Sequence, residues 1–212
     1  KVITGLRKQG TMVPGVKVKR GAWATGLNIK DAAKEKVEVL YFAGCQTSYN
    51  KNMWKLAKTT VKLLSQAGVN FGIPGENETC CGGRAYETGY QQDFLDQAKK
   101  NLNLIKKSGA KTIVTACAEC YYAFKVLYEK FNLIGKLEVL HISEYLARLL
   151  REGKLKPEKR LDMIVTYHDP CHLGRMGEPY IHWNGKEIID EIRTFDPPKE
   201  YRRGTYGIYE PP

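Results

Sequence analysis

This 212-residue chain contains six cysteines, and their spacing suggests metal binding or redox chemistry. Cys80 and Cys81 are adjacent and are followed by two glycines in the segment ETCCGG. A disulfide between neighbours is disfavoured, because their Cα atoms lie about 3.8 Å apart and disulfides usually need roughly 4.4–6.8 Å. A single zinc ion usually takes cysteines separated by about two to four residues, which lets both sulfurs turn inward. Adjacent thiolates diverge, so they suit a centre with more than one metal atom.

The other cysteines follow a regular spacing. Thirty-four residues separate Cys45 from Cys80, thirty-five separate Cys81 from Cys117, and Cys120 completes a C-x-x-C pair with Cys117. A lone cysteine is most often a small buried apolar residue. The N-terminus shows no signal peptide, so we expect a reducing compartment, where metal binding or redox chemistry is more common than a disulfide framework. Taken alone, the C-x-x-C pair also fits a thioredoxin-like dithiol or half of a zinc site.

Alternating strands and helices are expected to position these cysteines. Short apolar and β-branched runs predict strands near residues 37–44, 69–73, 111–116, 137–141 and 162–171. Amphipathic patterns predict helices near 52–68, 91–109, 118–131 and 144–153, the last capped by Ser143. This alternation favours an α/β, Rossmann-like fold with a parallel sheet and flanking helices. All six cysteines would then lie beyond the carboxyl ends of strands, the edge where such sheets bind ligands.

The charge is uneven along the chain. The net charge is +11, and residues 1–30 contribute seven basic and no acidic side chains. Glycine and proline interrupt this stretch, and Trp23 is its single aromatic residue. We therefore interpret residues 1–36 as a basic linker that orders on a partner subunit, and we expect no nucleic-acid binding.

The sequence also suggests where the domain begins and ends. We expect a domain at 37–176, then an irregular insertion at 177–212 leading into a second half outside this sequence. No apolar run approaches the roughly 20 residues that a membrane span needs.

The residues around the cysteines resemble a known family. The segments FAGC, ETCCGG, CAECYYAF and YHDPCHLGR are similar to the CCG-domain signature of heterodisulfide reductase catalytic subunits. Within that family, CCGGRAYETGY and CAECYYAF look most like the DsrK-type subunit of the membrane-bound electron-transfer complex of sulfate reducers. The resemblance covers about residues 37–176.

The resemblance implies a cofactor, a reaction and partners. The cofactor would be a noncubane 4Fe-4S cluster held by five thiolates, those of Cys45, Cys80, Cys81, Cys117 and Cys120, with Gly82 and Gly83 letting the backbone approach it. The reaction would be the anaerobic reduction of a disulfide or trisulfide, for example on a DsrC-type carrier protein, in two one-electron steps. Other subunits of a membrane-bound complex would hold the chain at the cytoplasmic face of the membrane. Cys171 resembles the first cysteine of a second CCG motif.

Four other side chains are candidates for contact with the substrate. His168 and His172 bracket Cys171 and could give a proton to a departing thiolate, or they are structural hydrogen-bonding groups. Arg84 and Arg175 could attract an anionic thiol, although surface arginines are usually only solvated. Two other functions stay open: an electron-transfer iron–sulfur subunit of a flavin-linked hydroxy-acid oxidase, and a zinc-stabilised interaction domain without turnover.

Overall fold

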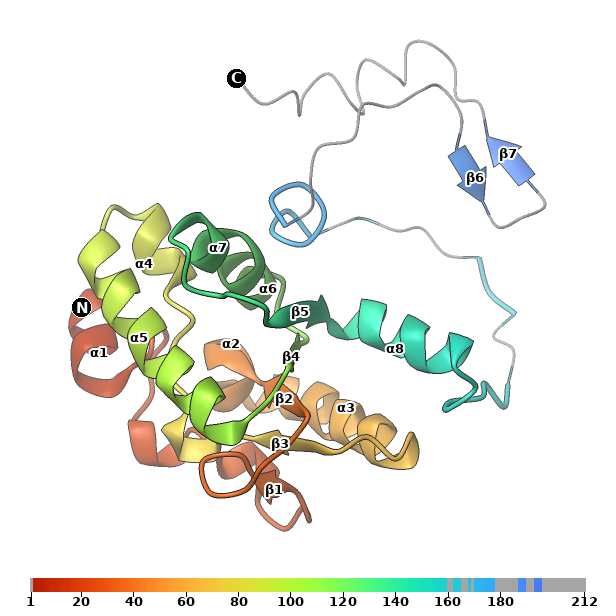
Figure 1. Ribbon diagram of the computed structural model, residues 1–212, viewed down its shortest axis with the longest axis horizontal. Coiled ribbons are helices and arrows are strands. Elements are labelled where there is room, and N and C mark those ends of the chain that lie inside the picture. The colour runs from red at the N-terminus through yellow and green to blue at the C-terminus, as the bar shows by residue number, and fades with distance from the viewer. Residues whose placement is uncertain are drawn as a thin grey trace.

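A five-stranded parallel sheet forms the centre of the protein in the computed structural model (Figure 1). Its strands lie in the spatial order β1-β3-β2-β4-β5 and have the bounds β1 Lys30–Asp31, β2 Val39–Phe42, β3 Phe71–Ile73, β4 Thr112–Thr115 and β5 Glu138–His141. The central strand β2 places Val39 opposite Phe71 on one side and Thr112 on the other. The structure describes residues 2–159, 162–164, 168 and 170–177, and the backbone of 187–189 and 193–195.

Helices cover both faces of the sheet, because the strands are apolar on both faces. Leu40 and Phe42 of β2 belong to a core that includes α5 (Gln91–Ser108) and the helical segment after β4. Val39 and Tyr41 belong to the core on the opposite face, which includes α3 (Trp54–Gln66) and α8 (Ile142–Arg151). The predicted α/β fold with a parallel sheet and flanking helices is therefore confirmed.

Short helices connect the sheet to its covering layers. After β2 come α2 (Gly44–Tyr49) and the 3₁₀ turn η3 (Lys51–Met53), and after β3 come η4 (Gly75–Asn77) and α4 (Gly83–Glu87). The helix predicted after β4 is divided into α6 (Ala118–Tyr122), a π-helical segment η5 (Ala123–Leu127) and α7 (Tyr128–Lys130). In the described part of the chain, no helix combines the length and apolarity needed to cross a bilayer.

The start of α8 differs from the prediction. His141, not Ser143, is the N-cap: its side chain accepts from the backbone N–H of Ser143 at 3.3 Å. The Glu144 carboxylate in turn accepts from the backbone N–H of His141 at 2.7 Å, which completes a capping box. The helix therefore begins directly after β5.

The N-terminal segment 2–36 is folded against the domain (Figure 1). It contains α1 (Val2–Gln9), the turns η1 (Lys17–Lys19) and η2 (Ala22–Ala24), and β1, which pairs with β3. Leu6 and Trp23 are almost completely buried in the two cores. Arg7 forms a two-pronged ion pair with Asp93 of α5, at 2.7 and 2.9 Å. Isolated apolar anchors thus pack the segment on the domain without any periodic pattern, whereas the sequence predicted a linker that orders on a partner subunit.

The C-terminal expectations lie mostly outside the described residues. Of the strand predicted at 162–171, the described residues 162–164, 168 and 170 are in neither helix nor strand, and Cys171 begins a turn that runs to 177. In the segment expected to be irregular, β6 (Glu187–Ile189) pairs antiparallel with β7 (Arg193–Phe195). The remaining residues of 178–212 lie outside the described part.

Candidate metal centre

The segments after three neighbouring strands carry five of the cysteines. Cys45 follows β2, Cys80 and Cys81 follow β3, and Cys117 and Cys120 follow β4. Because β3 and β4 lie on opposite sides of β2, the chain changes direction across the sheet at this point. Such a switch point opens a crevice at the carboxyl edge, where α/β sheets hold ligands. The prediction that these cysteines lie at strand ends is confirmed.

All five side chains line a single cavity of about 300 Å³. The thiols form a continuous series of contacts: Cys45 with Cys80, Cys80 with Cys81, Cys81 with Cys120, and Cys120 with Cys117. All five are free thiols. The rest of the cavity wall comes from Val2, Met12, Val13, Gln46, Arg84 and Glu119.

Contacts among the thiols shift their pKa values in opposite directions. A hydrogen bond with Cys80, together with burial, raises the pKa of Cys45 well above its usual value. Hydrogen bonds from Cys120 and Cys80 lower the pKa of Cys81, and a hydrogen bond from Cys120 lowers the pKa of Cys117. Those bonds raise the pKa of Cys120. Buried thiols that share protons in this way need added positive charge to ionise together, and metal ions supply such charge.

The arrangement fits a metal cluster better than a single ion. Among the described residues, no group of three or more His, Cys, Asp or Glu side chains is placed to hold one metal ion. Five thiols around a cavity of about 300 Å³ instead leave room for several metal atoms. Thiolates are the usual protein ligands of iron–sulfur clusters. The donor set and the space therefore fit such a cluster, which the thiols of Cys45, Cys80, Cys81, Cys117 and Cys120 would hold.

Two glycines with positive φ let the backbone approach the sulfurs. A Cβ added to Gly44, at φ +80°, would lie 2.9 Å from the Cys120 sulfur. Gly82, at φ +87°, donates its N–H to the Cys80 sulfur at 3.4 Å, and an added Cβ would lie 2.9 Å from the Phe94 ring. Both positions favour glycine. Sequence reasoning found Gly82 but missed Gly44, for which the segment FAGC was the available signal.

Buried hydrogen bonds fix the backbone of the adjacent pair. The Asn101 amide donates to the carbonyl of Cys80 at 3.0 Å, and the Tyr128 hydroxyl donates to the carbonyl of Cys81 at 3.1 Å. The N–H of Cys80 donates to the carbonyl of Gly10 at 2.8 Å. Asn101 and Tyr128 are fully buried and also bond to each other at 3.2 Å. Sequence reasoning missed this clamp, although a polar Asn101 in the apolar stripe of α5 was a signal.

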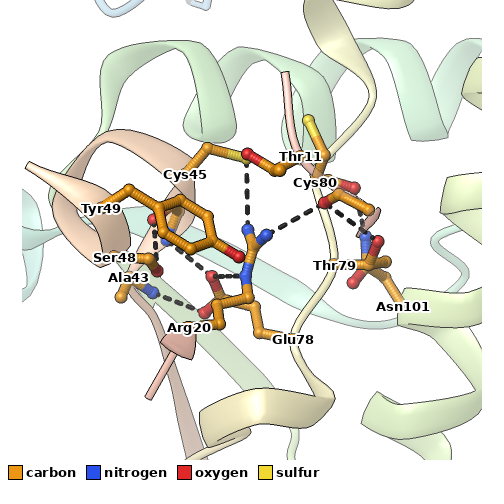
Figure 2. Close-up of polar contacts among 12 residues, drawn as sticks. Thr11, Arg20, Ala43, Cys45, Ser48, Tyr49, Glu78, Thr79, Cys80 and Asn101 are labelled. Carbon is orange, nitrogen blue, oxygen red and sulfur yellow. Dashed lines mark hydrogen bonds and ion pairs between the residues drawn. The ribbon is translucent and has the colours of Figure 1, made fainter. Parts of the chain in front are cut away.

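A buried ion pair lies beside Cys45 (Figure 2). The Arg20 Nε contacts the Glu78 carboxylate at 3.1 Å, and the side chains are 0% and 3% exposed. The same guanidinium donates to the Cys45 sulfur at 3.2 Å and to the Gly10 carbonyl at 2.9 Å. Sequence reasoning counted Arg20 within the basic stretch and gave Glu78 no role, so it missed both.

Of the residues predicted to contact the substrate, one lines the cavity and the histidines do not. Arg84 lines the cavity and pairs with Glu119 at 3.3 Å. The His172 Nε2 lies 2.6 Å from the Glu87 carboxylate, and neither His172 nor His168 is among the described residues that line the cavity. Of these three, the structure therefore brings Arg84 to the thiols. Two other predicted residues, Cys171 and Arg175, are exposed on the turn 171–177.

Comparison with known proteins gives the family. A family model described as a cysteine-rich domain, CCG, matches residues 39–125, a range that includes all five cavity cysteines. The chain carries a CCG domain. The match begins at the first residue of β2 and ends within η5, so the CCG domain matched here consists of the segments that bring these thiols together.

Relatives of this CCG domain include subunits of oxidoreductases. One subunit of the dihydromethanophenazine:CoB–CoM heterodisulfide reductase of Methanosarcina mazei is 42% identical over 150 residues, 67% of this chain and 35% of that subunit. EtfAB:quinone oxidoreductase of Syntrophomonas wolfei is 37% identical over 154 residues, 73% and 21% of the two chains. An iron–sulfur protein of Methanocaldococcus jannaschii is 37% identical over 162 residues, 76% and 30%. The chain spans about a third or less of these relatives, and no solved structure matches it.

Proposed function

We propose that this CCG domain belongs to the catalytic iron–sulfur subunit of an oxidoreductase that reduces S–S bonds. The observation that carries the proposal is the single cavity lined by five free thiols at the carboxyl edge of the sheet. The likeness to a heterodisulfide reductase of Methanosarcina mazei supports the direction of the chemistry. The more specific likeness to the DsrK-type branch, and with it sulfate reduction, is part of the proposal.

The cofactor we propose is a noncubane 4Fe-4S cluster. The contacts of the adjacent pair support this type, because Cys80 contacts Cys45 whereas Cys81 contacts Cys120. Two neighbouring thiolates with different partners suit different irons of one cluster. When bound, the cluster would supply the two electrons, in single-electron steps, that convert a disulfide into two thiols. The five cysteines would hold it, and the clamp by Asn101 and Tyr128 would keep the Cys80–Cys81 backbone in place.

The residues that line the cavity favour a disulfide substrate whose thiol halves have an apolar stem and an anionic end. Val2, Met12 and Val13 give one wall an apolar surface. Arg84 supplies a cation at the same cavity, and its side chain is 58% exposed, so it can exchange Glu119 for a substrate anion at little cost. A disulfide of a small anionic thiol, or a disulfide or trisulfide on the tail of a DsrC-type carrier protein, meets these conditions.

We assign proton supply to two histidines, one before the turn 171–177 and one within it. The two thiols formed by the reaction take up two protons. We propose His172, held by Glu87, and the exposed His168 as the groups that pass these protons inward from solvent. We also propose that other subunits of an electron-transfer complex deliver the electrons and hold the protein at the cytoplasmic face of a membrane.

The proposal is tested on anaerobically purified protein in its complex. We expect about four irons and four acid-labile sulfides per domain, a new paramagnetic signal when the cognate thiol meets the oxidised protein, and S–S reduction driven by reduced viologen. Arg84→Gln should raise KM for an anionic disulfide about tenfold. Arg151→Gln, a change of an exposed arginine at the end of α8, serves as the control. Zinc without acid-labile sulfide would support the zinc-stabilised interaction domain instead.

A second function is favoured by one observation. The likeness to an EtfAB:quinone oxidoreductase supports an electron-transfer subunit that receives electrons from a flavoprotein and does not act on sulfur. The flavin-linked hydroxy-acid oxidase is one such assembly. An intact complex that passes electrons rapidly from a flavoprotein, yet gives neither the thiol-dependent signal nor S–S reduction, would replace the first proposal with this one.

A further inference from the structure

Arg20 is a cation that the fold has placed out of water and against a sulfur. Its side chain is 0% exposed, and its guanidinium lies 5.7 Å from the centre of the Tyr49 ring. A buried guanidinium needs a partner for each of its N–H directions, because an unsatisfied buried charge is very costly. Here the partners are the Glu78 carboxylate and the Cys45 sulfur, which Figure 2 shows, and the Gly10 carbonyl.

Glu78 holds this guanidinium in position from the side away from Cys45. The Glu78 carboxylate accepts the N–H groups of Ala43 and Gly44, each at 2.9 Å, and is therefore fixed to the loop that precedes Cys45. With the Nε of Arg20 bound to that carboxylate, Nη2 is directed at the sulfur. The planar fork of arginine can meet these acceptors together, which the point charge of lysine cannot do.

The N-terminal segment that carries Arg20 packs closely against residues near the cysteines. A Cβ on Gly10, at φ +67°, would lie 2.4 Å from the Thr79 hydroxyl, and one on Gly15 would lie 2.4 Å from the Tyr49 ring. The Gly10 carbonyl accepts from both Arg20 and the N–H of Cys80. The basic N-terminal stretch is thus built into the cysteine site at two of its ligand positions.

We propose that Arg20 is a buried counter-ion that acts through Cys45 and raises the reduction potential of the cluster. The inference rests on the proposed function, because it requires a cluster on the five thiolates. Hydrogen bonds to ligand sulfurs and nearby charge are two of the factors that set iron–sulfur potentials. A donor that carries positive charge favours the more negative, reduced state. Glu78 is a positioning residue in this arrangement, since it contacts Arg20 and the backbone but no thiol in the described contacts.

The test is a redox titration of the cluster signal in anaerobically purified protein. The double variant Arg20→Met/Glu78→Gln removes both charges together, and the Gln oxygen can still accept from Ala43 and Gly44. We expect the one-electron reduction equilibrium constant to fall about tenfold, which corresponds to about 59 mV to lower potential. The matched control is Arg7→Met/Asp93→Asn, which removes another ion pair between the N-terminal segment and the domain without touching a cysteine. Its potential should equal that of the unchanged protein.

A conservative variant keeps the test decisive if the double variant loses the cluster. Arg20→Lys retains the charge but loses the fork, so the potential should fall by less than in the double variant. An unchanged potential in the double variant, or in Arg20→Lys when the double variant holds no iron, overturns the proposal. Equal shifts in the control would also overturn it, because they would show a general effect of loosening the segment. A failure of the proposed function looks different: the unchanged protein itself would then hold no iron–sulfur cluster.

Discussion

Two ion pairs flank the cysteines, and they differ in how far water reaches them. Arg20–Glu78 lies beside Cys45 and is almost fully buried, whereas Arg84–Glu119 lies at the cavity near Cys117 and is partly exposed, 58% for Arg84 and 24% for Glu119. A buried charge is held by partners on every side and is costly to separate from them. An exposed pair is screened by water and exchanges partners easily. An arginine–glutamate pair therefore suits two different tasks. The buried pair suits a constant electric field beside Cys45, and the more exposed arginine suits the reversible binding of a substrate anion.

The origin of the two arginines supports this division. Arg20 reaches the site from the N-terminal segment, 58 residues before its partner Glu78, so its placement depends on the complete fold. Arg84 lies in α4, three residues after Cys81, and moves with the loop that carries the adjacent pair. Both pairs are tertiary contacts, but Arg20 comes from a separate N-terminal segment, whereas Arg84 and Glu119 each lie near cysteines of the site.

The largest expected effect tests whether both ends belong to one site. Replacing Cys45 at one end, or Cys117 at the other, with serine should remove most of the iron, because a thiolate ligand is lost in each case. Cys171→Ser, a change of an exposed cysteine outside the cavity, should leave the iron content unchanged. Iron and acid-labile sulfide analysis measures this. If Cys45→Ser kept all its iron while Cys117→Ser lost it, the two ends would not share a cluster.

The next effect separates the two arginines by stability. Arg20→Met leaves Glu78 as a buried unpaired charge, so the free energy of unfolding should fall by about 3–5 kcal/mol. Arg84→Met breaks an exposed pair and should cost less than about 1 kcal/mol. Urea denaturation under anaerobic conditions gives both values. Similar losses in the two variants would remove the distinction on which the comparison rests.

A smaller effect concerns the glycine that lies between the two ends. Gly44→Ala forces a side chain into positive φ, at a cost of about 1–2 kcal/mol, and also against the Cys120 sulfur at 2.9 Å. Gly68→Ala, at φ +67° with no atom within 4 Å of the added Cβ, has the backbone strain alone and is the control. We expect both variants to lose stability and only Gly44→Ala to lose iron. Full iron occupancy in Gly44→Ala would show that the backbone need not approach the thiols so closely.

The sequence predicted the parts of the site that depend on local pattern. The strands around Val39, Phe71 and Thr112 have apolar, β-branched neighbours, and the cysteines lie in the segments after these strands, so the common edge could be inferred from the alternation of elements. The family resemblance implied the five proposed ligand positions, and the structure places all five thiols at one cavity. Arg84 was found because it adjoins the motif.

The parts that were missed depend on long-range contacts. Leu6 and Trp23 each fill one buried position, which gives no periodic signal, so the segment around them resembled a linker. Arg20 and Glu78 acquire their roles only when the chain closes over 58 residues. Asn101 is one polar residue in an apolar helix face, and its acceptor, the Cys80 carbonyl, is invisible to sequence patterns. Side-chain type alone does not predict which distant backbone group a buried polar residue meets.

The smallest effect comes from a third pair, Glu138–Arg148, which sets the baseline for an ion pair away from the cysteines. The Arg148 guanidinium donates to the Glu138 carboxylate at 2.9 Å and lowers the pKa of Glu138. A carboxyl with a lowered folded pKa contributes stability above its unfolded pKa of about 4.3 and loses it as pH falls through the lower folded value. Arg148→Gln should therefore lower the free energy of unfolding by less than about 1 kcal/mol at pH 7 and by still less at pH 3.5, measured by urea denaturation of the cluster-free chain.

The cluster potential of Arg148→Gln at pH 7 should equal that of the unchanged protein, because neither side chain lines the cavity. A shift as large as that expected for Arg20→Met/Glu78→Gln would mean that the potential responds to any lost charge in the domain, and the buried pair beside Cys45 would then have no special place.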